Sequence, residues 1–563
     1  MPVAPTYPGV YIEEIPSGVR TITGVATSIT AFIGRALNGP TNKVVTINSY
    51  GDFERIFGGL WVNSTLGYAV RDFYLNGGSQ AIIVRLYHEE KGKPSKSKLA
   101  FDGVKLEAAY EGSWGTYLRG STDTDVSEVV ALNMGLTKGD LFNLTVFEDK
   151  PGGRTEVFRN LSFKDGPRRV DNVLAAGSVL VRWDSSSPLD PDPTKRPAVA
   201  AGQDEVRKAE QDLADKKKTL ADAIQAKKAQ AEIDTDTKAV EDAKTALQKT
   251  KDPLAASDGV ALTLAEDFTP NKAETDKKGL YALAQADLFN ILCVPPYLAT
   301  GDVDDGLISA AAAYCEKRRA MLLVDSPSGW NTKDAAKTGI NAGVGTTSKN
   351  AAIYFPRLRQ RNILRDNQFE EFVPCGAVSG TFARTDTQRG VWKAPAGLDA
   401  VLNNVPALSV DLNDPENGEL NPLGVNCLRT MVPSGRIIWG SRTLQGDDRL
   451  ASEWKYVPVR RTALFIEESL YRGTQWVVFE PNDEPLWAQI RLNVGAFMHN
   501  LFRQGAFQGA TPKDAYFVKC DKETTTQNDI NLGIVNIVVG FAPLKPAEFV
   551  IIKLQQMTGQ IET

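Results

Sequence analysis

Few side chains in this chain of 563 residues have the type and spacing that catalysis or metal binding needs. The two histidines, His88 and His499, lie far apart and belong to no HExxH motif. A zinc site or a histidine-based triad needs several such groups close together. The five cysteines are scattered, without CxxC spacing: Cys293, Cys315, Cys375, Cys427 and Cys520. Their odd number argues against a disulfide framework and favours a reducing compartment, and we expect no metal site.

Other candidate sites have simpler interpretations. The glycine-rich stretch Gly343–Ser348 lacks the lysine and the spacing of a phosphate loop, so we expect a flexible loop. Asp302, Asp304 and Asp305 lack the glycine and glutamate pattern of a calcium loop and are better placed to cap the helix that follows. There is no GxSxG motif. The sequence therefore predicts a protein that is not an enzyme and needs no cofactor.

The composition also argues against a nucleic-acid-binding protein and against a membrane-spanning protein. The 64 Lys and Arg against 69 Asp and Glu give a net charge of -5, which is not the basic footprint of a nucleic-acid binder. No apolar run approaches the roughly 20 residues of a membrane helix, and the first residues lack the charged and apolar regions of a signal peptide. We expect cytosolic synthesis without direct membrane insertion. The length predicts two to four domains.

Apolar periodicity predicts an α/β core assembled from two separated parts of the chain. Near the N-terminus a strand (28–36), two helices (50–57 and 66–75) and a strand (81–87) form a β-α-β unit. The pattern resumes at Gly279, with predicted strands at 288–296, 320–327 and 351–358 and a helix at 305–319. Strands that alternate with helices indicate a parallel or mixed sheet.

The residues between these two parts have a different secondary-structure pattern and composition. Short alternating strands with Gly, Asp and Asn turns predict a β-rich inserted domain at 89–200. Residues 201–252 are rich in Ala, Lys, Asp and Glu, and predict a helical hairpin with helices at 204–231 and 237–250, broken at Asp234–Thr237. Its thin apolar seam suits either a solvated insertion or a surface that contacts a partner.

Both chain ends carry strand patterns without a nearby hairpin partner. Val10–Ile15 alternates apolar and polar residues, and two β-branched runs, Ile530–Phe541 and Phe549–Leu554, flank a proline-rich spacer. Such strands either complete their own domain or pair with another chain, where backbone hydrogen bonds give affinity. The candidate N-terminal arm is Val10, Tyr11, Ile12, Glu13, Glu14 and Ile15; the candidate C-terminal arm is Phe549, Val550, Ile551, Ile552, Lys553 and Leu554.

Three motifs at the two ends carry a resemblance to a known family. PGVYIEEIPSG (Pro8–Gly18), GSRTL (Gly440–Leu444) and PNDEPLW (Pro481–Trp487) resemble the sheath subunit of contractile phage tails and of related phage-tail-like injection particles. The resemblance covers both ends and most of the α/β part, but not about 90–278. It implies a subunit that forms stacked six-membered rings around an inner tube and contracts to drive the tube through an envelope.

The resemblance also implies partners and a location. The partners are other copies, joined by strand exchange between the arms, the inner tail tube protein, and baseplate and tail terminator proteins. The subunit would be in the producing cytoplasm during assembly and then in a virion tail or an injection particle, and the sequence leaves these two open. A non-contractile assembly protein, such as a capsid or surface-layer subunit, shares the composition and stays an alternative.

The expected fold is multidomain α/β and α+β, with composite inner domains from both chain ends around the insertions. The predicted divisions are an N-terminal arm (1–20), an α/β middle domain (21–88 and 279–430), the outer domain (89–200), the hairpin (201–252), a linker (253–278), a tube-facing inner domain (431–545) and a C-terminal arm (546–563).

Two further groups of residues are candidates for contacts. The helix Ala488–Phe507 is either a core helix or presents a polar face to the tube, with Asp483, Glu484, Arg491, Asn500 and Arg503 as candidates. A charged cluster is either a set of ordinary surface ion pairs or a set of rim contacts that exchange as subunits slide. Its members are Arg442, Arg449, Arg460, Arg461, Asp447, Asp448, Glu467 and Glu468.

Overall fold

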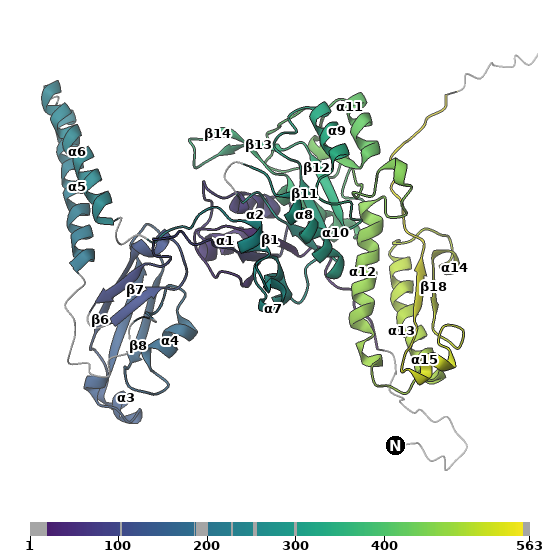
Figure 1. Ribbon diagram of the computed structural model, residues 1–563, viewed down its shortest axis with the longest axis horizontal. Coiled ribbons are helices and arrows are strands. Elements are labelled where there is room, and N and C mark those ends of the chain that lie inside the picture. Colours follow the sequence, from purple (N-terminus) through teal and green to yellow (C-terminus); the bar gives the residue numbers. More distant parts are fainter. Residues whose placement is uncertain are drawn as a thin grey trace, which may run out of the picture.

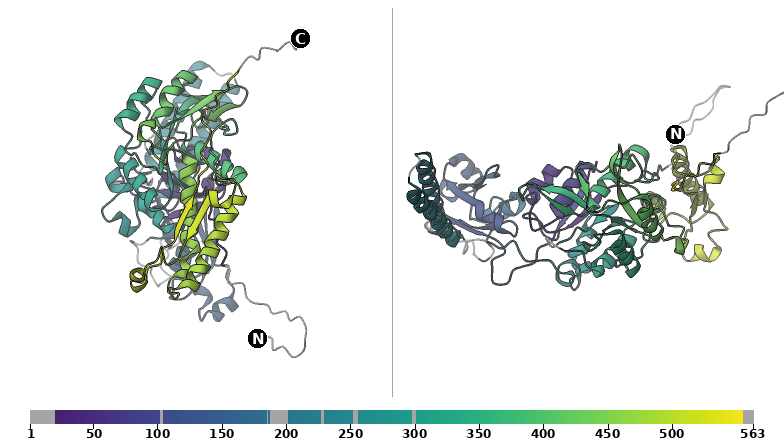
Figure 2. Two further views of the ribbon diagram at one scale, coloured as in Figure 1. Left: turned by 90° about the vertical axis from the view of Figure 1, so that its right-hand side faces the viewer. Right: turned by 90° about the horizontal axis from the view of Figure 1, so that it is seen from above.

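The molecule is elongated, with three parts that follow one another along its long axis (Figures 1 and 2). The computed structural model describes residues 20–101, 104–184, 186, 201–226, 229–251, 256–297 and 301–554. A β-rich outer domain with a helical hairpin stands at one end, an α/β middle domain lies in the centre, and a helical C-terminal region lies at the other end. The mixed α/β fold expected from the sequence is confirmed at this level.

The middle domain is built on an eight-stranded sheet with the order β17-β16-β12-β11-β10-β1-β3-β2. Its strands are β1 (Thr30–Gly34), β2 (Val44–Ile47), β3 (Ala81–Arg85), β10 (Ile291–Cys293), β11 (Met321–Asp325), β12 (Ala351–Phe355), β16 (Val425–Met431) and β17 (Gly435–Ile438). The inner strands run parallel, while β2 and β17 are antiparallel at the two edges. The two parts of the chain predicted to form one sheet meet where β1 pairs with β10.

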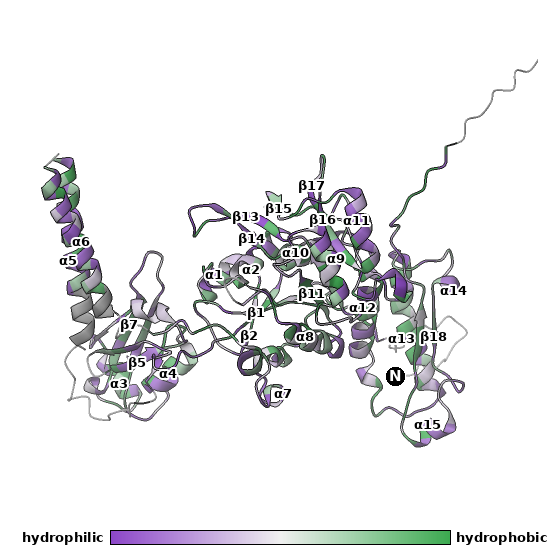
Figure 3. Cartoon of the chain, turned by 45° about the horizontal axis from the view of Figure 1, so that its top comes forward, coloured by the Kyte–Doolittle hydropathy of each residue, from purple (hydrophilic) through white to green (hydrophobic). Residues whose placement is uncertain are grey.

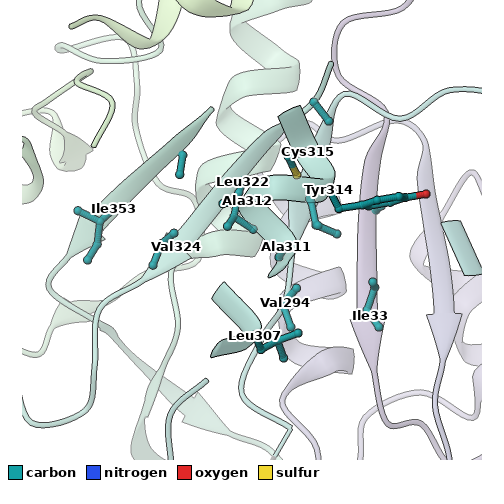
Figure 4. Packing of buried hydrophobic residues seen from close by; sticks show 14 of the residues in the cluster. Ile33, Val294, Leu307, Ala311, Ala312, Tyr314, Cys315, Leu322, Val324 and Ile353 are labelled. Carbon is teal, nitrogen blue, oxygen red and sulfur yellow. The ribbon is translucent and has the colours of Figure 1, made fainter. Parts of the chain in front are cut away.

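Helices cover both faces of this sheet, which explains why its strands are apolar throughout. On one face lie α1 (Tyr50–Phe57), α2 (Leu66–Leu75) and α10 (Cys375–Arg389); on the other lie α8 (Asp305–Lys317), α9 (Lys333–Ala342) and α11 (Asp414–Leu420). Figure 4 shows the α8 side, where Leu307 and Tyr314 pack with Leu322 and Ile353 of the sheet. On the opposite face, Gly376 and Gly380 let α10 approach α2, because a Cβ at either position would strike an α2 carbonyl oxygen.

A small antiparallel sheet stands beside this domain, formed by β13 (Leu358–Asn362), β14 (Gln368–Phe372) and β15 (Ala407–Leu408). The β13–β14 hairpin projects from the body of the domain (Figure 1). It exposes Ile363, Leu364 and Phe369, which are large apolar residues.

The outer domain consists of two three-stranded sheets around one apolar cluster. One sheet contains β4 (Lys98–Phe101), β5 (Val104–Ala108) and β9 (Val181–Trp183); the other contains β6 (Leu118–Asp123), β7 (Phe142–Glu148) and β8 (Thr155–Leu161). Two helices accompany them, α3 (Glu128–Asn133) and α4 (Val170–Gly177). The buried Arg85 guanidinium donates to the Glu111 carbonyl oxygen at 2.8 Å, so a charged contact ties the outer domain to the end of β3.

The predicted helical hairpin is present, but its break is elsewhere. Its helices are α5 (Ala201–Gln225) and α6 (Gln230–Lys251), so Asp234–Thr237 lies inside α6 and not between the helices. Thr235 and Thr237 donate their hydroxyls to carbonyl oxygens four residues earlier, which lets a capping-type sequence remain helical. Ala223, Val240 and Ala243 form its buried seam.

Two predicted boundaries need correction. Residues 253–278 are more than a linker, because Leu262 and Phe268 are buried in the core of the middle domain and α7 (Ala273–Asp276) follows them. The boundary at 430 is also wrong, since Gly435–Ile438 pairs with β16 as the edge strand of the middle sheet. Core packing of distant residues decided the first boundary and strand pairing decided the second, and local sequence patterns report neither.

The C-terminal region packs two long helices, α12 (Val457–Gly473) and α13 (Glu484–Arg503), beside a two-stranded sheet. The sheet pairs β18 (Tyr516–Lys519) with β19 (Val538–Phe541), and two short helices flank it, α14 (Pro512–Ala515) and α15 (Gln527–Asn531). The predicted strand at Ile530–Phe541 is therefore only partly correct. Its first residues complete α15, where Thr526 and Asp529 form a capping box.

Candidate assembly surfaces

The candidate C-terminal arm lies fully in solvent. In the described part of the chain no strand contains Phe549–Leu554, and its apolar side chains are 73–94% exposed. These residues leave the body of the molecule as an extended segment (Figure 1). A run of large apolar residues without cover is a surface that another chain can bury. The candidate N-terminal arm, Val10–Ile15, lies outside the described residues.

The start of this arm is held by a buried ion pair. Glu548 accepts two hydrogen bonds of 2.7 Å from Nε and Nη2 of Arg442, and a third of 3.0 Å from the Tyr456 hydroxyl. Burial by itself raises the pKa of Glu548, but the hydrogen bonds and charge of Arg442 outweigh it and lower that pKa below its ordinary value. The arm is therefore held at Glu548, which we call its root, and the residues after it lie exposed to solvent.

The two-stranded sheet offers edges to which a further strand could add. β18 and β19 pair only with each other among the described residues, so each has a second edge without a ladder partner. An isolated two-stranded sheet is marginal by itself. Here α13 supports it, because Phe507, Tyr516 and Phe541 pack in the cluster that holds the helix.

Helix α13 has one buried face and one exposed face. Ile490, Val494 and Met498 are fully buried, which agrees with the interpretation of a core helix. Of the candidates for a tube contact, Asp483, Glu484, Asn500 and Arg503 are exposed, while Arg491 is half-buried and pairs with Glu484 at 2.5 Å. Asn493 on the same helix is buried, and its Oδ1 accepts from the backbone N–H of Arg20 at 3.1 Å.

The loop before α13 contains a residue that sequence reasoning missed. Phe479 is 102% exposed and has a φ of 70°, a left-handed conformation that an aromatic residue rarely adopts. Val478 and Glu480 beside it are also exposed. Strained residues of this kind are enriched at functional sites. No local sequence signal predicts a positive φ at a phenylalanine.

The charged cluster separates into several ion pairs, and the side chains of three of its arginines are buried. Arg461 and Asp386 pair at 2.6 Å with both side chains buried, and Arg460 pairs with Glu467 along one helix at 3.1 Å. Arg442 also binds Asp448 at 2.9 Å. The interpretation as exposed rim contacts is therefore wrong for Arg442, Arg460 and Arg461.

The remaining members of the cluster are of two kinds. Glu468 is buried and binds Arg319 at 2.8 Å and Arg472 at 2.7 Å, so it is not part of an ordinary surface ion pair. Arg449 pairs with its near neighbour Asp447 at 2.5 Å on the surface, where an ion pair contributes little.

Two of the three aspartates at the start of α8 act differently from expectation, while Asp305 is the first residue of the helix. Asp304 occupies the N-cap position, but its carboxylate accepts from the Tyr297 hydroxyl and makes no cap hydrogen bond. Asp302 binds Ser328 and Arg357. Among the described residues no group of His, Cys, Asp or Glu is arranged to hold a metal ion, and no helix there is long and apolar enough to cross a membrane.

We compared the chain with protein-family models, curated proteins and solved structures. Residues 451–557 match the family model described as phage tail sheath C-terminal domain, which confirms the resemblance for this segment. No curated protein matches the chain.

Solved structures extend the likeness to the whole fold. A chain from the contracted sheath complex of PVC, an extracellular contractile injection system, is 20% identical with a TM-score of 0.54, and the match covers 98% of each chain. A chain from the anti-feeding prophage baseplate is 21% identical with a TM-score of 0.52, covering 99% of this chain and 100% of that one. The sheath tail protein from Listeria innocua is 12% identical with a TM-score of 0.55, covering 93% and 96%.

Proposed function

We propose that this chain, which carries the C-terminal domain of the phage tail sheath family and has the fold of sheath proteins along its whole length, is the subunit of a contractile sheath. It polymerises around an inner tube and shortens to drive that tube through an envelope. The observation that carries the proposal is the exposed apolar arm Phe549–Leu554, rooted at Glu548 beside a sheet with unpaired edges.

The arm supplies the link between copies. When its strand adds to an edge of the β18–β19 sheet of a neighbour, backbone hydrogen bonds give affinity and alternate side chains give register. The contact is heterologous, so it generates an open helical array, here stacked six-membered rings. The N-terminal arm, Val10–Ile15, acts in the same way from the other chain end.

Contraction in this proposal needs no nucleotide. Two packings of the same folded subunit differ in free energy, and the domains rotate as rigid bodies between them. The buried pairs Arg442–Glu548 and Arg461–Asp386 keep each body intact, while exposed pairs such as Arg449–Asp447 can exchange partners. The exposed residues Phe479, Asp483, Glu484, Asn500 and Arg503 face the tube.

The proposal includes a location and further partners. The subunit assembles in the producing cytoplasm and then belongs to a phage tail or to an injection particle, with baseplate and terminator proteins at its ends. A capsid or surface-layer role is the alternative, but no observation on the molecule favours it.

Electron microscopy of the purified full chain tests the proposal. We expect hollow, striated cylinders of uniform width, alone or after the candidate tube protein is added. Closed shells or flat two-dimensional arrays would contradict it. Globular particles that persist with the tube protein present would also contradict it.

A further inference from the structure

A hollow of about 640 Å³ lies in the middle domain. It is bordered by the β13–β14 hairpin, the loop at 401–406 and the start of β17. Arg71, Arg361 and Arg436 line it, with amide side chains beside them. No carboxylate occurs among the described residues that form the lining. We call this surface the arginine hollow.

Two of the three arginine charges in the hollow have no carboxylate partner among the described residues; the third, Arg71, lies 3.7 Å from Asp72. Arg361 and Arg436 form no ion pair with any residue that the structure describes, and Nε of Arg436 is buried without a hydrogen-bond acceptor. The Arg361 guanidinium lies 4.8 Å from the centre of the Phe369 ring. An unpaired guanidinium beside an apolar rim is well suited to a carboxylate partner, because Arg binds carboxylates with two parallel donors.

Apolar residues line the hollow beside its arginines and amides. Ile363 at the end of the hairpin is 59% exposed, and Val405 and Pro406 border the same space. Figure 3 shows this hairpin and β17 along the upper edge of the middle domain. A partner for the hollow should therefore carry apolar side chains together with carboxylates.

Helix α3 of the outer domain has this combination. Val129 and Leu132 are 65% and 67% exposed, and Met134 beside them is exposed as well. Asp125 and Glu128 flank them in solvent and form no ion pair within the described residues. We call these five residues the α3 patch. It stands on a separate small cluster of Val126, Ala131 and Leu141.

We propose that the α3 patch of one copy docks into the arginine hollow of a second copy. Asp125 and Glu128 meet Arg361 and Arg436, and Val129 and Leu132 cover Ile363. The two surfaces belong to different domains of one molecule (Figure 1), and each copy that docks leaves one patch and one hollow free for further copies.

The chemistry of the hollow favours a polypeptide over a nucleic acid. None of the described residues that line it is aromatic, so the hollow itself lacks the row of aromatic side chains on which successive bases stack. The chain also carries a net charge of -5, which repels a polyanion at long range. The contact involves neither the chain termini nor the tube-facing loop, so it does not depend on the proposed function.

Cross-linking of engineered cysteines tests the contact, because all five native cysteines are buried. A Val129→Cys chain is mixed with an Ile363→Cys chain and treated with a short bismaleimide. We expect a covalent dimer from this mixture and none from the matched mixture of Val129→Cys with Lys217→Cys on the hairpin. Equal dimer yields in the two mixtures would overturn the proposal.

Exchange of charges gives an independent readout of the same contact. In this cross-linking assay, D125R/E128R on the Val129→Cys chain or R361E/R436E on the Ile363→Cys chain should each lower the dimer yield roughly tenfold. A mixture of the D125R/E128R chain with the R361E/R436E chain should restore the dimer yield. A loss without restoration would contradict direct pairing of these charges.

Two controls distinguish a variant that is misfolded from a hollow that binds nucleic acid. Circular dichroism of each variant shows whether it is folded, and a labelled single-stranded DNA replaces the partner in one arm. Tight DNA binding that R361E/R436E abolishes, without a cross-link, would assign the hollow to nucleic acid and overturn the proposal. Cross-linking is measured on soluble chains, so it can succeed when cylinders fail to form, and cylinders can form without it.

Discussion

Arg442 and Glu548, 106 residues apart in the sequence, form a two-pronged ion pair with both hydrogen bonds at 2.7 Å, and the Arg442 side chain is fully buried. The pair joins the GSRTL segment to the root of the C-terminal arm. It fixes where the exposed apolar residues Phe549–Leu554 leave the molecule.

Replacement of Glu548 by Gln should loosen the root of the arm. The charge of Arg442 would keep only Asp448 as a close anionic partner, and the loss of a charged hydrogen bond costs about 1.5–3 kcal/mol. Hydrogen exchange should accelerate at the backbone amides of Thr443 and Val457, which donate to the carbonyl oxygens of Lys455 and Ser441 beside Arg442, measured by mass spectrometry. The exposed Glu523→Gln is the matched control, and equal exchange in the two variants would contradict the assigned role.

The same contact predicts a response to acid. Because the pKa of Glu548 is lowered in the folded state, its stabilising contribution is complete above the unfolded value of 4.5 and is lost as the pH falls through the lower folded value. The hydrogen-bonded amides of Thr443 and Val457 beside Arg442 should keep a constant opening free energy from pH 7 to pH 5 and lose protection below pH 4.5. Protection that declines between pH 7 and pH 5 would contradict this assignment.

Asp72 on α2 should give the opposite pH dependence. Burial raises its pKa to about 6, although the charge of Arg71 and a hydrogen bond from Gln360 oppose the change. The folded state then binds a proton that the unfolded state releases, so the free energy of unfolding falls as the pH rises from 3.8 to 6. Relative to the Asp72→Asn variant, the free energy of unfolding of the wild-type chain should fall by at most ~3 kcal/mol over this pH range, as measured by urea unfolding. A constant difference between the two chains would show that Asp72 does not titrate there.

Arg461 and Asp386 provide a double-mutant test of a buried pair. Each side chain is 3% exposed, so the removal of one partner leaves an uncompensated charge and costs about 3–5 kcal/mol. Arg461→Met and Asp386→Asn should each lower the free energy of unfolding by this order, and the double variant by much less than their sum. Additive losses would mean that the two charges act independently.

The arms should control polymerisation without affecting the fold. Ile551→Asp places a charge in the exposed apolar run, and deletion of residues 1–15 removes the other arm. Both variants should remain folded monomers in sedimentation velocity, because neither change alters the core clusters. Lys553→Gln is the matched control for the C-terminal arm. Normal cylinders from Ile551→Asp would exclude strand exchange by this arm.

The sequence by itself determined the elements whose signals are local. The helix at Leu66–Leu75 and the buried strands at Thr30–Gly34, Ala81–Arg85 and Ala351–Phe355 follow from periodicity and from Gly and Asn at their ends. The PNDEPLW motif (Pro481–Trp487), which lies in the segment that matches the sheath family model, was also readable because it is short and continuous.

Only the tertiary structure decided which residues far apart in the sequence meet. Local patterns did not show that β17 closes the middle sheet, that Phe268 enters its core, or that Arg461 is buried against Asp386. A charged residue has the same local pattern on a surface and in a buried pair, since burial depends on what the rest of the chain packs against it. The exposure of Phe479 and the arginine hollow are results of packing for the same reason.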